Sequence, residues 1–125
     1  VSSKDAFSLV MTHECAHRYF QCTTFQGLNN GAWEEELACD FFMGVRSMIE
    51  QIADICKVAN GLGKCPGAKS HPDGDLRVDA IIQGQQTVLH FQKNNIPPTI
   101  QNFTQAFFQY CNTIKPTIFA RESRF

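Results

Sequence analysis

Two histidines four residues apart, with a glutamate beside the first, are the residues of this chain best suited to chemistry. In the run His13-Glu14-Cys15-Ala16-His17 the histidines lie about one helical turn apart, so both imidazoles project from one face. Two neutral imidazole nitrogens can then reach a single ion at about 2.0–2.1 Å. Glu14 is rotated about 100° from His13, where it can take a proton from an attacking water. The spacing predicts a metal-dependent hydrolytic site.

A third ligand for this ion is predicted in the acidic stretch that follows. Eighteen residues separate His17 from Glu36, and two histidines with one glutamate are a recurrent ligand set for catalytic zinc. Asp40 shares the helical face of Glu36 and could accept the second ring N–H of a ligating histidine. Glu34 and Glu35 compete with Glu36, because consecutive glutamates are also typical of a solvated first helical turn. The aspartate at the plus-four position favours Glu36.

These residues together resemble the gluzincin zinc peptidases, the clan that includes thermolysin and the aminopeptidases. The match consists of His13, Glu14, His17, Glu36 and Asp40, and the resemblance covers roughly half of the chain. It implies a zinc-dependent endopeptidase that acts on a peptide or protein substrate. One zinc ion per chain would be held by the two histidines and Glu36, with Glu14 as the general base.

Two other interpretations of the motif stay open. The chain could be a catalytically inactive zinc-binding domain, derived from a peptidase, that serves interaction or regulation. It could also be a plain helical bundle in which the motif arises by chance. The intact Glu14 argues against the inactive domain, because loss of activity often removes the base while the ligands persist.

A second segment, from His71 to Arg77, reads H-P-x-x-x-x-R. It resembles the segment that follows the third ligand in the integral-membrane CAAX-type and heat-shock zinc protease group. The resemblance implies that Arg77 lies near the metal site and bonds Glu36, Asp40 or a substrate carboxylate. It also allows His71 to donate a hydrogen bond to the oxyanion of the scissile carbonyl. An ordinary loop before a helix explains the same residues, and Arg77 itself or a tyrosine, Tyr19 or Tyr110, could be the oxyanion partner instead.

Length and composition restrict the class of protein. The 125 residues suit a single domain, 1–125, and 43% apolar residues with eleven phenylalanines supply a core. A net charge of −1 without a basic run gives no reason to expect nucleic acid, and no apolar stretch is long enough for a membrane span. The first residues lack the features of a signal peptide. The chain does not begin with methionine, so it could be a fragment of a longer one.

The six cysteines favour a reduced protein, and therefore a cytoplasmic location, although secretion stays open. Cys15 and Cys39 fall inside the two metal motifs, at positions that suit a small buried residue. Cys56 and Cys65 could pair, and Cys111 has no evident mate. No spacing has the C-x-x-C form of a structural zinc site.

The apolar periodicity predicts a mainly α fold with little or no β-sheet. We expect a compact, zincin-like core of four helices, over about 4–26, 32–58, 73–93 and 99–112. The first would carry the histidines, the second the glutamate ligand, and the aromatic residues of the fourth would be core. Many gluzincins hold the substrate on the edge strand of a β-sheet. Only twelve residues precede His13, too few for such a sheet. Either the chain is a minimal, soluble, all-helical variant, or a missing segment or a partner supplies the substrate edge.

Overall fold

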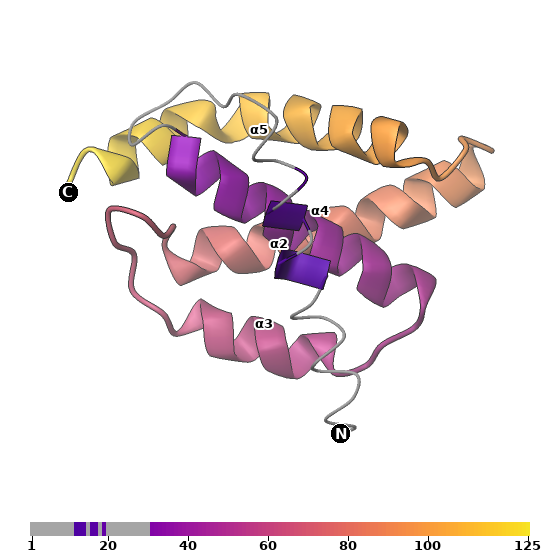
Figure 1. Ribbon diagram of the computed structural model, residues 1–125, viewed down its shortest axis with the longest axis horizontal. Coiled ribbons are helices and arrows are strands. Elements are labelled where there is room, and N and C mark those ends of the chain that lie inside the picture. The colour runs from indigo at the N-terminus through magenta and orange to yellow at the C-terminus, as the bar shows by residue number, and fades with distance from the viewer. Residues whose placement is uncertain (1–11, 15, 18, 20–30) are drawn as a thin grey trace.

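A computed structural model describes residues 12–14, 16, 17, 19 and 31–125, and this part of the chain is mainly helical, as predicted (Figure 1). Residues 12–14, 16, 17 and 19 are helical. The other helices are α2 (Ala32–Ile49), α3 (Ile55–Gly63), α4 (Gly74–Lys93) and α5 (Ile100–Glu122). Extended pairing in the described residues is confined to an isolated bridge between Ala68 and His71. None of the described helices is both long and apolar enough to cross a bilayer.

The most extensive contact in the fold joins α2 to α4. Two glycines make this close approach: Gly44 on α2 lies against the backbone of Ile81, and Gly84 on α4 lies against the backbone of Phe41. A Cβ atom at either glycine would come within 2.0 Å of the opposing carbonyl oxygen. The crossing therefore depends on the absence of a side chain at both positions.

Helices α5 and α3 lie on opposite sides of the α2–α4 pair (Figure 1). On the α5 side, Phe41 contacts Phe107 edge-to-face, with ring centroids 5.5 Å apart, and Phe103 stacks on Phe91. The prediction that the aromatic residues of the last helix are core is confirmed: Phe103 and Phe107 are buried, and Phe108 and Tyr110 pack partly buried against them. On the α3 side a smaller apolar cluster consists of Met43, Ile52, Ile55 and Ile81.

The prediction of one helix over 32–58 was wrong. Helix α2 ends at Ile49, Gln51 adopts the left-handed conformation with φ of 54°, and α3 begins at Ile55. Ile52 and Ile55 are nevertheless buried, because α3 folds back onto α4. The apolar spacing of α2 thus continues across the turn. Because the turn contains no glycine or proline, there is no local sign in the sequence that the helix ends there.

The two last helices were predicted more closely. Helix α4 ends at Lys93 as expected, whereas α5 continues ten residues beyond the predicted end, with Pro116 inside it. Asp73 is the N-cap of α4, but its carboxylate accepts hydrogen bonds from Arg121, in the last turn of α5, and from Arg124, just after that helix. Most of the predicted first helix, over 4–26, lies outside the described residues.

Candidate metal centre

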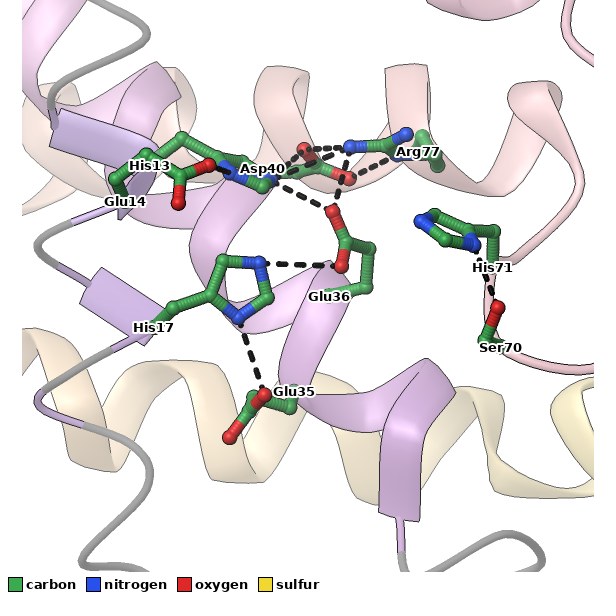
Figure 2. Close-up of polar contacts among 9 residues, drawn as sticks. All are labelled: His13, Glu14, His17, Glu35, Glu36, Asp40, Ser70, His71 and Arg77. Atoms are coloured by element: carbon green, nitrogen blue, oxygen red, sulfur yellow. Dashed lines mark hydrogen bonds and ion pairs between the residues drawn. The ribbon is translucent and has the colours of Figure 1, made fainter.

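Three parts of the chain meet at the predicted site (Figure 2). His13 and His17 come from the first helical segment, which is tied to α2 by a hydrogen bond of 2.8 Å from Arg46 Nη1 to Thr12 Oγ1. Glu36 lies on α2, one turn before Asp40. Arg77 comes from the first turn of α4, and the crossing at Gly44 holds α4 against α2.

The Glu36 carboxylate lies between the two imidazoles. Its Oε1 is 2.8 Å from His13 Nε2, and its Oε2 is 3.2 Å from His17 Nε2. The structure therefore brings together the three residues that the sequence proposed as metal ligands.

The two competing glutamates, Glu34 and Glu35, do not lie between the imidazoles. Glu34 is buried with 4% of its surface exposed, and its Oε2 has no hydrogen-bond partner among the described residues. Burial raises the pKa of Glu34. Glu35 reaches the other nitrogen of the second histidine, with its Oε2 3.1 Å from His17 Nδ1. Glu35 had been expected only as a competing ligand, although its place beside Glu36 was a signal that it could lie near the same ring.

Arg77 binds two of the acids of α2, Asp40 and Glu36 (Figure 2). Its Nε and Nη2 donate to the two oxygens of Asp40 at 2.8 and 3.0 Å, and Nη2 also donates to Glu36 Oε1 at 3.0 Å. Asp40 is completely buried. The guanidinium thus compensates two neighbouring carboxylates that would otherwise repel each other. This is the position that the H-P-x-x-x-x-R segment implied for Arg77.

The sequence had suggested that Asp40 accepts the second ring N–H of a ligating histidine. The structure places Asp40 elsewhere. Its Oδ1 lies 3.4 Å from His13 Nε2, the same nitrogen that faces Glu36. The reason is that Arg77 holds the Asp40 carboxylate in a two-pronged contact on the α4 side. Asp40 is therefore part of the inner acidic group.

The remaining predicted site residues lie at the edge of the group or away from it. The Glu14 side chain is 64% exposed, with Oε1 3.6 Å from His13 Nδ1. His71 is exposed, its Nδ1 lies 2.8 Å from Ser70 Oγ, and it stands on the opposite side of Glu36 from His17 (Figure 2). Tyr19 is exposed. Tyr110 lines a separate groove between α4 and α5.

The acidic group changes the protonation of the site. Burial alone would lower the pKa of His13, but hydrogen bonds and charge interactions with Asp40 and Glu36 raise it to about 9. Burial alone would raise the pKa of Glu36, but its hydrogen bond to His13 and the charges of His13 and Arg77 lower it. Glu36 is therefore ionised at neutral pH, the form in which a carboxylate binds a metal.

The described residues form a candidate metal-binding group made of His13, His17, Glu36 and Asp40. Donor atoms of His13, Glu36 and Asp40 lie within 4.8 Å of one another, and so do those of the two histidines and Cys39. Imidazole nitrogens with carboxylate oxygens suit a divalent transition metal such as zinc. The donor set fits the ion that the sequence implied.

The described cysteines, Cys39, Cys56, Cys65 and Cys111, are free thiols. Cys39 is buried, as expected for a small residue inside the motif. Burial and the neighbouring acids raise the pKa of its thiol.

Comparison of the chain with models of protein families, with curated proteins and with solved structures finds no match. A functional assignment therefore depends on the chemistry and geometry of the site.

Proposed function

We propose that this chain is a zinc-dependent endopeptidase of the gluzincin type. The observation that supports it most directly is the Glu36 carboxylate, which lies 2.8 and 3.2 Å from the Nε2 atoms of His13 and His17. Two residues of one helical segment and one of α2 thus converge on one small volume. This convergence of two imidazoles and one carboxylate is the usual protein share of a catalytic zinc site.

His13, His17 and Glu36 would hold the ion, one per chain. When bound, zinc would polarise the substrate carbonyl and lower the pKa of a water toward about 7. Arg77 would keep Glu36 and Asp40 in place through its three hydrogen bonds. These bonds use Nε and Nη2 of Arg77, so its Nη1 or the exposed His71 would be the donor to the substrate carbonyl.

Glu14 would act as the general base. Its exposed carboxylate, next to His13 and outside the Arg77 network, is accessible to an attacking water. It would accept the proton from this water as the oxygen attacks the peptide carbonyl, and would return it to the amine that leaves.

The test is the substitution Glu14→Gln, with Glu50→Gln as the matched control. Glu50 is a half-exposed glutamate at the end of α2 that pairs with Arg46. Glu14→Gln should keep about one zinc per chain and lose about 10²- to 10⁴-fold in peptidase activity, the usual contribution of a general base. The control should keep both. Retained activity in Glu14→Gln would remove Glu14 from this role.

One observation favours the alternative of a zinc-binding domain without turnover. The Cys39 thiol is a donor close to both imidazoles, and a fourth protein ligand is typical of a closed, structural zinc site. Replacement of zinc by cobalt would distinguish the two. A sulfur-to-cobalt charge-transfer band that disappears in Cys39→Ser, with no cleavage of a peptide library, would favour the closed site.

A further inference from the structure

The two imidazoles of the candidate metal centre differ in how their second nitrogens are held. His17 has a carboxylate at each nitrogen, with Nε2 3.2 Å from Glu36 Oε2 and Nδ1 3.1 Å from Glu35 Oε2. For His13, the described carboxylate beside Nδ1 is that of Glu14 at 3.6 Å, which is too long for a hydrogen bond. Among the residues that the structure describes, a carboxylate lies within hydrogen-bond distance of the outer nitrogen of His17 but not of that of His13.

We propose that Glu35 is a positioning residue that fixes the tautomer and the orientation of His17; this inference rests on the proposed zinc site. A neutral imidazole carries one N–H, and the other nitrogen presents a lone pair. A carboxylate that accepts the N–H at Nδ1 leaves the lone pair on Nε2, the nitrogen on the Glu36 side of the ring, where it would be available to the ion. A carboxylate behind a ligating histidine also raises the basicity of the ring.

The place of Glu35 in α2 suits this role. It lies in the first turn of the helix, where the helix dipole favours a negative charge. Neighbouring residues of a helix point about 100° apart, so Glu35 and Glu36 approach the His17 ring from different sides (Figure 2). The Glu35 side chain is 27% exposed, so its contact with Nδ1 is partly shielded from water.

The same role cannot fall to Asp40, the residue to which the sequence pattern assigned it. The Asp40 carboxylate is held by the Arg77 fork, and its nearest histidine nitrogen is Nε2 of His13, on the inner side of the site. Glu35 is the described carboxylate that contacts the outer nitrogen of His17.

The first test is zinc affinity, measured by competition with a chromophoric chelator for the wild type, Glu35→Ala, Glu35→Gln and the control Glu50→Ala. Glu35→Ala should bind zinc about 10- to 100-fold more weakly, as is usual when such a partner is lost. Glu35→Gln should lose less, because its amide oxygen can still accept the N–H. The control should match the wild type. Circular dichroism would confirm that the variants are folded.

The outcomes separate this inference from the proposed function. If the wild type binds zinc and Glu35→Ala binds it equally well, the role of Glu35 is refuted and the zinc site stands. If the wild type binds no zinc, both are refuted.

A second test follows the proton of His17 in the zinc-loaded chain, because without the ion the Glu36 carboxylate faces Nε2 and competes for a proton there. Nitrogen-15 NMR of the histidine-labelled protein should show His17 with its proton on Nδ1, and His17→Gln would assign the signal. Glu35→Ala should make this proton exchange faster with water. A wild-type His17 that carries its proton on Nε2, or an unchanged exchange rate in Glu35→Ala, would overturn the inference.

Discussion

Substitution of Gly44 by alanine should separate α2 from α4 and disturb the metal centre one turn away. A Cβ at Gly44 would lie 2.0 Å from the carbonyl oxygen of Ile81, whereas ordinary contacts begin near 3.4 Å. The opposing atom belongs to the backbone of a helix and cannot rotate away, so the helices must move apart locally by about 1.4 Å.

The expected cost follows from two opposing effects. Alanine favours a helix over glycine by about 0.5–1 kcal/mol. Overpacking of a close contact costs about 1–3 kcal/mol, and occasionally more. The clash is backbone against Cβ and leaves little freedom to adapt, so we expect a net loss of about 1–2 kcal/mol in the free energy of unfolding.

The same displacement should reach the site, because Arg77 lies one turn before Ile81, and Asp40 lies one turn before Gly44. The hydrogen bonds of 2.8 and 3.0 Å between Arg77 and Asp40 should lengthen as the helices move, although the flexible Arg77 side chain can follow part of the shift. Zinc affinity should therefore fall together with stability.

The assay is urea unfolding followed by circular dichroism, and Gly61→Ala is the matched control. Gly61 also lies in a helix, α3, but a Cβ there would meet nothing within 4 Å. The control should gain about 0.5–1 kcal/mol from helix propensity and keep its zinc affinity. A Gly44→Ala variant as stable as Gly61→Ala would refute the argument from the helix crossing.

Two further predictions concern the ion pairs of Arg77 and Arg121. Arg77→Met should reduce the free energy of unfolding by about 3 kcal/mol, because it leaves Asp40 and Glu36 buried with His13 as their remaining cation. A thermal melt with a change below about 1 kcal/mol would contradict this. The hydrogen bond from Arg121 lowers the pKa of Asp75, so this pair should stabilise the fold above pH 3.8 and lose its effect as the pH falls through the lowered pKa. Arg121→Gln should return the pKa of Asp75 toward 3.8 in a carbon-13 NMR titration and cost at most about 1 kcal/mol, because the pair is exposed. An unchanged pKa would exclude this contact in solution.

The local spacing of residues was enough to predict which histidines and which acids could form the site. Histidines at i and i+4 must share a face of any helix that contains them, and the same holds for Glu36 and Asp40. The mainly helical character and the end of α4 at Lys93 also follow from periodicity and from the residues after it. These features depend on neighbours within a few residues, which the sequence displays directly.

The break between α2 and α3 depends on packing against α4, a helix that lies further along the sequence. The residues Ile52 and Ile55 continue the apolar spacing of α2, so a single long helix satisfies the local pattern. In the described part of the chain, Ile52 and Ile55 are buried against Ile81 of α4 and Met43 of α2, and the chain reaches this place by a turn through Gln51. Burial against another helix therefore outweighed local periodicity.

The tertiary structure also decided which carboxylate contacts which histidine nitrogen. The sequence alone determined that the protein is helical, that two histidines share one helical face, and that a second helix carries acids that could contact them. Which carboxylate faces which nitrogen depended on Arg77, which holds Asp40 from α4 and leaves Glu35 to contact the outer nitrogen of His17. That assignment requires the close crossing at Gly44 and Gly84. A crossing of two helices depends on long-range packing, and the local pattern of either helix alone does not contain it.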